Sequence, residues 1–395
     1  MKIITEKAYY TFSFFKDLAL IYPVYLILFK QSGLDFVQIS ILLAVWAAAM
    51  FVAEIPSGIL SDIWSRKGTI FIALLFKGAG FVVWIIWPSF YGYLAGFVLW
   101  GVQEALCSGT TNAMLYDALT IENKESQFAK ILGRGHFASR LGIILSVLLG
   151  GLVFSRSVTI TLVCSTFSMI MAAVCVLFIK ERRTIYTHDN SNTSEIRNLL
   201  NTVISSFKIY GLYRYIFFGS FITVVYGILD EYDFVLAREY NVPVSMIGLW
   251  GAVRFGSEGL GALAAEKINF IFGFDNHAKM AGWAVAGGVL VILGTLTGVK
   301  SLLIAYFVFF FFMASFDVLY HAGLQQKIDT IGRATISSVA SAIYTGIGIL
   351  LGIGFGFVAD FVGLRFLFVA GGSSIVICAS VWVIVLKLQK NKQTL

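Results

Sequence analysis

The sequence predicts an all-α integral membrane protein, and three observations lead to this class. Of the 395 residues, 58% are hydrophobic and only 13% are charged, whereas soluble domains carry about 25% charged residues. The mean hydropathy is +0.85. Apolar stretches of roughly 20 residues, long enough to cross a bilayer as helices, recur along the whole chain. These runs are solidly apolar rather than alternating, which excludes a membrane barrel and leaves helices as the spanning structure.

Twelve of these stretches are expected to be transmembrane helices, in two groups of six. The first group covers about residues 8–29, 37–60, 69–87, 90–118, 137–155 and 158–179. The second covers about 215–236, 245–265, 278–299, 301–323, 336–360 and 364–387. We therefore expect two pseudo-symmetric six-helix bundles, at residues 1–179 and 214–395.

Residues 180–213 form the one long polar connection. Its later part places Ile196, Leu199, Leu200, Val203, Ile204 and Phe207 on one helical face. This pattern predicts an amphipathic helix on the cytoplasmic membrane surface.

The positions of lysine and arginine predict the orientation in the membrane. If both termini are cytoplasmic, inner loops and ends hold 21 of the 29 basic residues, and the outer loops hold five: Lys30, Arg156, Arg238, Lys300 and Arg365. This asymmetry predicts a multi-pass protein of the cell inner (plasma) membrane with both termini cytoplasmic. Orientation and lipid contact explain the net charge of +7, so nucleic acid is not an expected partner. The first span starts after Lys7 and has no cleavage site, so we expect it to be retained.

No enzymatic activity, metal or cofactor is expected. The four cysteines lie inside spans without CxxC spacing: Cys107, Cys164, Cys175 and Cys378. Disulfides and metal sites are therefore not expected. No nucleophile-and-base spacing stands out. A nucleotide-binding GxxxxGK[ST] loop does not occur, so any active transport would draw on an ion gradient.

Residues 58–67, GILSDIWSRK, place one carboxylate and two cations between two apolar spans. In such a short connection Gly58 is expected to allow close helix approach. Asp62, Arg66 and Lys67 are expected at the cytoplasmic boundary, where a carboxylate and a guanidinium can pair across helices. The stretch resembles the loop motif of the major facilitator superfamily, Gly-x-Leu-Ala/Ser-Asp-x-x-Gly-Arg-Lys/Arg. It matches at Gly58, Leu60, Ser61, Asp62, Arg66 and Lys67, and Ser65 stands where glycine is usual.

The resemblance extends along the chain and implies a monomer with a cytoplasmic gate. A weaker copy of the motif, GALAAEK, follows at residues 261–267, with Ala265 in the place of Asp62. Four further segments, EIPSG, SGTTNAMLYDAL, LDEYD and RATISSVAS, are similar to a drug/proton-antiporter-like branch of bacterial permeases. The resemblance implies that Asp62 faces the helix start near residues 335–338 and that Arg66 pairs with Asp117. The gate would comprise Gly58, Asp62, Arg66, Lys67 and Asp117.

Ionisable residues deep in the spans are the second group of candidates, because each is costly in a bilayer. They are Lys16, Asp17, Glu54, Lys77, Glu104, Asp230, Glu231, Asp233, Arg254, Glu258, Asp317 and His321. A carboxylate in an apolar cavity can take up a proton on one side and release it on the other. Asp17, Glu104 and Asp230 are the preferred carriers.

Two pairs with helical i,i+4 spacing add to these candidates. Arg254 and Glu258 share one helical face, so they either pair structurally or take part in proton coupling. Asp317 and His321 repeat the spacing and are a possible proton relay.

These residues predict a proton-coupled secondary transporter that exports hydrophobic or cationic small molecules. Aromatic faces and carboxylates suit such substrates. Against antiport, the stretch LGIILSVLLGG keeps Gly142, Gly150 and Gly151 but has Ser146 and Val147 where antiporters often carry Gly-Pro. Two alternatives stay open: nutrient uptake by proton symport, and a membrane sensor without net transport.

Overall fold

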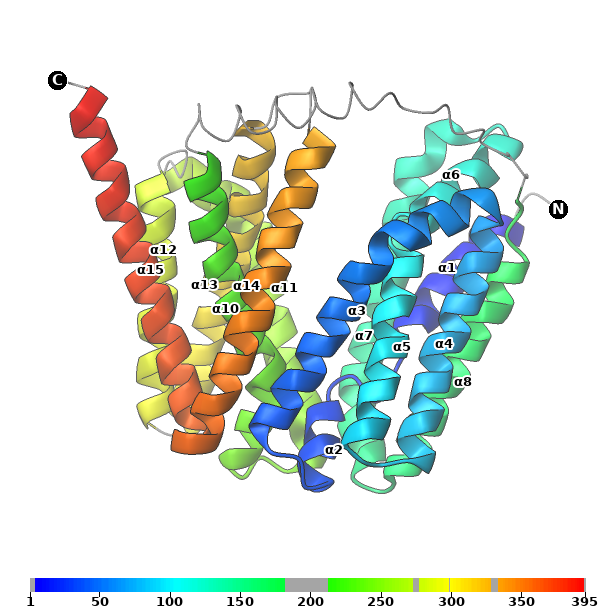
Figure 1. The fold of residues 1–395 in the computed structure, drawn as a ribbon, viewed down its shortest axis with the longest axis horizontal. Coiled ribbons are helices and arrows are strands. Elements are labelled where there is room, and N and C mark those ends of the chain that lie inside the picture. Colours follow the sequence, from blue (N-terminus) through cyan, green and yellow to red (C-terminus); the bar gives the residue numbers. More distant parts are fainter. Residues whose placement is uncertain (1–3, 182–211, 273–276, 298, 328–332, 394–395) are drawn as a thin grey trace. The chain divides into compact units, whose positions relative to one another are not determined.

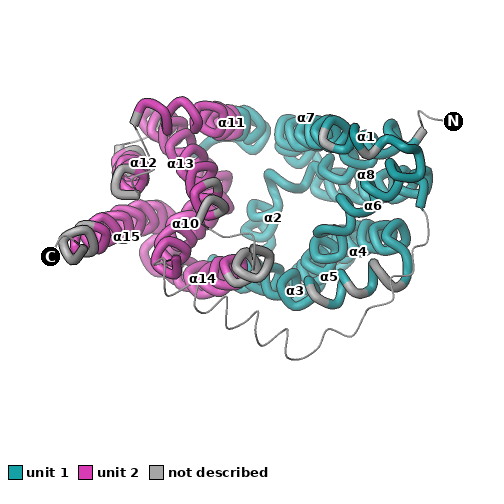
Figure 2. Tube along the Cα trace, turned by 90° about the horizontal axis from the view of Figure 1, so that it is seen from above, with its two compact units in different colours: residues 1–187, 241–252 teal, residues 188–240, 253–395 magenta. Residues whose placement is uncertain are grey.

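The computed structural model describes residues 4–181, 212–272, 277–297, 299–327 and 333–393 (Figure 1). The described residues are almost entirely helical and contain no strand. The chain divides into two compact units, one of residues 1–187 and 241–252 and the other of residues 188–240 and 253–395 (Figure 2). The expected surface helix within residues 180–213 lies largely outside the described residues.

Among its described residues, the first unit contains eight α-helices. They are α1 (Ile4–Asp17), α2 (Tyr25–Gln31), α3 (Phe36–Ile63), α4 (Arg66–Ile86), α5 (Phe90–Cys107), α6 (Thr110–Ile121), α7 (Phe128–Phe154) and α8 (Val158–Leu177), with a short 3₁₀ turn η1 (Glu125–Gln127) before α7. Helix α1 packs against α7 and α8, and α5 packs against α3 and α4.

The described part of the second unit contains six long helices. They are α10 (Leu212–Glu239), α11 (Ile247–Phe272), α12 (His277–Thr297), α13 (Val299–Lys327), α14 (Arg333–Val362) and α15 (Leu364–Gln393). The short η2 (Val244–Met246) and the first residues of α11 belong to the first unit. Within the second unit, α12 packs against α13 and α15, and α10 packs against α14 and α15.

All twelve expected spans are helical in the described part of the chain, which confirms the predicted fold class. Among the described residues, eight helices are long and apolar enough to cross a membrane by length and composition, and α12 contains a shorter apolar segment. Two expected spans are interrupted, which their continuous apolar pattern did not predict. The first is split into α1 and α2, and the fourth into α5 and α6.

Both interruptions have local causes. Between α1 and α2, Pro23 lacks a backbone N–H and cannot continue a helix ladder. The Ile21 N–H, left without a helical partner there, donates to Ser165 Oγ of α8 at 3.1 Å. Between α5 and α6, Gly109 adopts a left-handed φ of 65°, a conformation that favours glycine.

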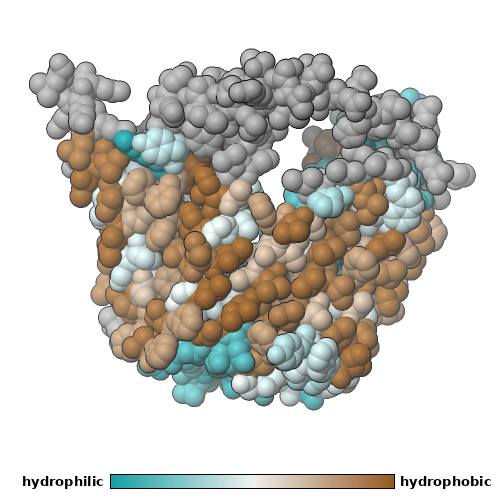
Figure 3. All heavy atoms as spheres, in the orientation of Figure 1, coloured by the Kyte–Doolittle hydropathy of each residue, from teal (hydrophilic) through white to brown (hydrophobic). Residues whose placement is uncertain are grey.

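Helix α8 shows how the fold suits a bilayer. One stripe, spaced three or four residues apart, is exposed and apolar: Ile160, Val163, Phe167, Ile170, Val174 and Leu177. The opposite face is buried and includes small polar residues such as Thr161, Ser165 and Ser168. Hydrophobic residues likewise cover much of the helix surface in view, and hydrophilic ones gather toward helix ends (Figure 3). A helix that contacts lipid is expected to have an exposed face that is more apolar than its buried face.

Candidate functional site

The charged loop between α3 and α4 is a two-residue connection, Trp64 and Ser65, as its length predicted. Ser65 is the N-cap of α4, and its hydroxyl accepts a hydrogen bond from the Gly68 N–H at 2.9 Å. Serine at the position where glycine is usual therefore adds a cap. Gly58 lies inside α3, and a Cβ there would meet nothing within 4 Å in the described part of the chain. Because α3 continues to Ile63, the turn itself is made beyond Gly58, and the role of this glycine in close helix approach stays a prediction.

Arg66, the first residue of α4, pairs with Asp117 of α6. Its Nη1 donates to Asp117 Oδ2 at 2.6 Å, and the two side chains are 17% and 24% exposed. The resemblance implied this pair, and the structure contains it. The backbone of Asp62 belongs to the last turn of α3, but its side chain lies outside the described residues, as do the side chains of 335–338.

Lys67 and Glu181 form a second connection, which no motif in the sequence predicted. Glu181, just beyond α8, accepts hydrogen bonds from the Lys67 backbone N–H at 3.1 Å and from the Ser65 hydroxyl at 2.7 Å. In return, Lys67 Nζ donates to the carbonyl oxygens of Leu177 and Ile179 at 3.3 and 3.4 Å. Each helix end thus receives a side chain of the charge that its dipole favours. The start of α4 is tied directly to the end of α8.

A third cluster at this end of the unit surrounds Glu122, which directly follows α6. Its side chain is 2% exposed and lies 3.1 Å from Lys180 Nζ and 3.4 Å from Lys124 Nζ. Thr5 of α1 donates to it at 2.9 Å, and Lys124 also pairs with Glu6. Burial acts to raise the pKa of Glu122, but hydrogen bonds from Thr5, Lys180 and Lys124 outweigh it and lower that pKa. The start of α1, the loop after α6 and the end of α8 therefore meet here.

The two preferred acids of the first unit both lie at helix interruptions. Asp17 is the last residue of α1, where Ser139 of α7 donates to its Oδ2 and Lys16 Nζ lies 3.7 Å away. Glu104 lies one turn before the end of α5 and accepts a hydrogen bond from Trp100 Nε1 at 2.9 Å. Interrupted helices are typical of transporter binding sites.

Lys77 of α4 lies beside this acidic region and is nearly buried. Its Nζ is 4.0 Å from Glu104 Oε1, the outer limit of an ion pair, with 5% of the side chain exposed. It also lies over the rings of Trp100 and Tyr22, at 4.3 and 5.1 Å from their centroids. These two rings stack at 5.4 Å. The aromatic faces therefore supply part of the stabilisation that the lysine loses by leaving water.

In the second unit, three carboxylates converge on the guanidinium of Arg254. Nη2 lies 2.6 Å from Asp230 Oδ1, Nη1 lies 3.4 Å from Asp233 Oδ2, and Nε lies 3.4 Å from Glu258 Oε1. Glu258 also accepts a hydrogen bond from the Tyr226 hydroxyl at 2.8 Å. The expected Arg254–Glu258 pair is present, but two acids from α10 share the same cation. Sequence spacing could not reveal this, because α10 and α11 are separate helices.

The exposed fractions divide these acids into two kinds. Asp233 is fully buried, whereas Asp230 is 28% and Glu258 21% exposed. The Arg254 side chain is 8% exposed, and the guanidinium carbon lies 4.1 Å from the ring centroid of Phe255. With all acids ionised the group would carry two net negative charges, which is costly at such burial. Protonation of Asp230 or Glu258 would relieve this imbalance.

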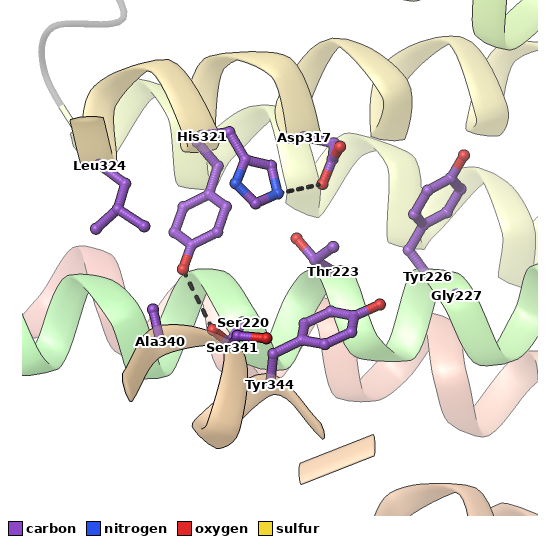
Figure 4. A pocket seen from close by; sticks show the side chains of 11 residues that line it. Ser220, Thr223, Tyr226, Gly227, Asp317, His321, Leu324, Ala340, Ser341 and Tyr344 are labelled. Carbon is purple, nitrogen blue, oxygen red and sulfur yellow. Dashed lines mark hydrogen bonds and ion pairs between the residues drawn. The ribbon is translucent and has the colours of Figure 1, made fainter. Parts of the chain in front are cut away.

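Asp317 and His321 of α13 form an ion pair at 3.5 Å on the wall of a cavity between α10, α13 and α14 (Figure 4). The cavity volume is about 460 Å³, within the range of small-molecule sites. No cluster of metal-ligand residues occurs among the described residues.

The sequence profile of the Major Facilitator Superfamily matches residues 9–389. The chain belongs to this superfamily. It is therefore a multi-pass membrane protein and a secondary transporter of small molecules. No curated protein sequence matches the chain closely enough to narrow the assignment further.

Solved superfamily structures share the fold at low sequence identity. The nucleoside transporter NupG is 14% identical with a TM-score of 0.79, covering 98% of this chain and 99% of its own. A bacterial homologue of the human lysosomal transporter Spinster, in an inward-facing and unoccupied conformation, is 16% identical with a TM-score of 0.74, covering 97% and 95%. A D-xylose–proton symporter is 13% identical with a TM-score of 0.67, covering 96% of each chain.

Proposed function

We propose that this transporter is proton-coupled and exports hydrophobic or cationic small molecules by alternating access. It would act as a monomer in the cell inner membrane with both termini cytoplasmic. The observation that supports proton coupling best is the excess of negative charge around Arg254. Three carboxylates lie within 3.4 Å of one guanidinium. Keeping all three ionised in a bilayer would cost a large free energy of desolvation.

Asp230 and Glu258 are the proposed proton-binding groups of this cluster. Both are partly exposed, so protons can reach them, and both contact Arg254 directly. When one of them is protonated, its attraction for the guanidinium weakens and Arg254 pairs more strongly with Asp233. Proton binding would in this way change which contacts hold α10 and α11 together. Asp17 and Glu104, at the interruptions of α1 and α5, are the corresponding candidates in the first unit.

The cytoplasmic loop is proposed as the gate. Arg66–Asp117 and Lys67–Glu181 join α4 to α6 and α8 within the first unit. In this proposal Asp62 provides the contact that closes the cytoplasmic side and breaks when that side opens. Asp62→Asn should therefore change both the transport rate and the distribution of conformers. If both stayed as in the unmodified protein, the role of Asp62 would be abandoned.

Nutrient uptake by proton symport is the second candidate. The solved structures that share the fold include a nucleoside transporter and a D-xylose–proton symporter, and α7 lacks the Gly-Pro pair that antiporters often carry. The same carboxylates could serve symport. A sensor without net transport is the third candidate, and the number of buried charges counts against it.

Reconstituted vesicles with an internal pH dye distinguish these candidates. Lipophilic cations, amino acids, nucleosides and sugars are added outside one at a time. In acid-loaded vesicles antiport raises the internal pH, because protons leave as the solute enters. Symport lowers the internal pH of vesicles that start at equal pH, because proton and solute enter together.

The variants Asp17→Asn, Asp230→Asn and Glu258→Gln locate the proton-binding groups. Asp360→Asn, at an exposed position near the end of α14, is the matched control and should behave like the unmodified protein. Proton movement that is undiminished in all three variants would contradict the assignment of these acids. No proton movement with any solute class would contradict proton coupling itself.

A further inference from the structure

The cavity between α10, α13 and α14 carries polar side chains from all three helices. Its wall includes Ser220 and Thr223 from α10, Asp317 and His321 from α13, and Ser341 and Tyr344 from α14. Figure 4 shows Asp317 and His321 on one helix, opposite Ser220 and Thr223 on another, with Tyr344 contributed by the third. Only a few lining residues, such as Leu324 and Ala340, are purely apolar.

Two polar side chains on this wall face each other. Thr223 interacts with the carboxylate of Asp317, although neither Thr223 Oγ1 nor Asp317 Oδ1 makes a hydrogen bond of normal geometry within the described part of the chain. The nearest cationic partner of Asp317, His321 Nε2, lies 3.5 Å away, beyond the usual hydrogen-bond length of about 2.7–3.2 Å. An ionised carboxylate has about four acceptor sites, so Asp317 can accept further hydrogen bonds from a ligand in the cavity.

Aromatic side chains form much of the remaining wall, and two of them are fixed in place. The Tyr320 ring stacks on Tyr215 at 5.3 Å, and its hydroxyl lies 3.2 Å from Ser220 Oγ. Tyr226 is held by its hydrogen bond to Glu258. Preorganised tyrosine faces next to a carboxylate are suited to an organic cation, because both attract positive charge.

The groups facing Asp317 come from every helix around the cavity. His321 and Tyr320 lie on its own helix, Tyr226 comes from α10 and Tyr344 from α14. Glu258 of α11 accepts a hydrogen bond from the Tyr226 hydroxyl. Of these, only His321 can supply a positive charge. An incoming cation therefore competes with the imidazolium for the same carboxylate.

We propose that this cavity binds a small organic monocation, whose ammonium group takes the place of the His321 imidazolium at Asp317. The ring or alkyl part of the cation lies against Tyr226 and Tyr344. Binding to the protonated pair leaves His321 neutral and releases its proton to water, so one positive charge replaces another. This inference deepens the proposed function by naming the substrate class and the site at which substrate and proton exchange.

Equilibrium binding to the purified full-length protein in detergent tests the proposal without requiring transport. The probes are tyramine and benzyltrimethylammonium, with 4-ethylphenol as the uncharged analogue of tyramine. Calorimetry in buffers of different ionisation enthalpy measures proton release. We expect net proton release on cation binding in acidic buffer and less release in alkaline buffer, because the cation displaces a proton from the pair. The cations should also bind more tightly at the higher pH.

Three variants assign the roles. Asp317→Asn should weaken cation binding by about tenfold or more, because the charged partner is lost. His321→Gln should still bind both cations but release no proton at either pH. Asp360→Asn, outside the cavity, should match the unmodified protein in affinity and proton release.

Several results would overturn the proposal. These are equal affinity for 4-ethylphenol and tyramine, no binding of either cation at millimolar concentration, undiminished affinity in Asp317→Asn, or proton release that persists in His321→Gln. If Asp317→Asn does not fold, the comparison of tyramine with 4-ethylphenol on the unmodified protein still decides. If the binding experiment failed but a nutrient moved protons in the vesicle experiment, the proposed cation site would be abandoned. Proton-coupled transport would still be supported.

Discussion

The carboxylate of Glu181 accepts a hydrogen bond from the backbone N–H of Lys67 at 3.1 Å. This contact joins the first turn of α4 to the residues that follow α8, at the point where the polar connection begins. The Lys67 side chain in turn donates hydrogen bonds to the carbonyl oxygens at the end of α8. A residue of the superfamily loop motif is thus held by a carboxylate that the motif does not include.

Glu181→Gln should destabilise the first unit, because the negative charge at the start of α4 is lost. The expected loss is about 1 kcal/mol, comparable to the removal of a helix cap. The midpoint of thermal unfolding, followed by tryptophan fluorescence in detergent, measures it. Glu266→Gln, at an exposed position of α11, is the control. Identical midpoints for the two variants would show that Glu181 does not cap α4.

Arg254→Met should be strongly destabilising, since it leaves Asp233 buried without its cation. Breaking a buried ion pair by removing one partner costs about 3–5 kcal/mol. The double variant Arg254→Met/Asp233→Asn should recover part of this loss, because the buried charge is removed as well. Thermal unfolding measures both variants. Arg140→Met, at an exposed position of α7, should change stability by less than about 0.5 kcal/mol. A double variant less stable than Arg254→Met would argue against the pairing.

Glu122 should make stability depend on pH. Its pKa in the folded protein lies below the ordinary value of about 4.5. The unfolded chain therefore binds more protons in this window, and stability rises with pH. The contribution is complete above the ordinary value and is lost as pH falls through the folded-state pKa. The unfolding midpoints of the unmodified protein and Glu122→Gln should differ most near neutral pH and converge on acidification. A difference that widened in acid would refute this assignment.

Gly150→Ala should disturb the packing of α7 on the interruption between α1 and α2. A Cβ at this position would lie 2.4 Å from the Leu20 carbonyl oxygen and 2.6 Å from Pro23 Cγ, closer than real contacts allow. Gly133→Ala in the same helix is the matched control, because its Cβ would meet nothing within 4 Å. The control should be neutral or stabilising by up to about 1 kcal/mol. Equal unfolding midpoints would mean that α7 can move away without cost.

The sequence predicted the helices well because the bilayer constrains length and hydropathy strongly. It predicted contacts only where spacing or a motif fixes them, as for Arg254–Glu258 and Arg66–Asp117. It did not predict that Asp230 and Asp233 share Arg254, because packing between helices is not encoded in local periodicity. Glu181 was missed for the same reason.

The motif position of Gly58 did not predict where the helix ends, because α3 continues to Ile63. The interruptions after Asp17 and Glu104 could have been inferred from Pro23 and from the Ser108–Gly109 pair. The apolar runs around them concealed these local signals.

The two faces of α8 have different roles: the exposed face keeps the helix in the membrane, and the buried face attaches it to neighbouring helices. Its exposed stripe is apolar, so lipid solvates it as well as protein would, and hydrophobic burial gives α8 little reason to associate with α1 or α4. Cohesion depends instead on close packing and on contacts such as Ser165 with the Ile21 N–H. A single lost hydroxyl at Ser165 could therefore loosen the bundle while leaving membrane insertion unchanged.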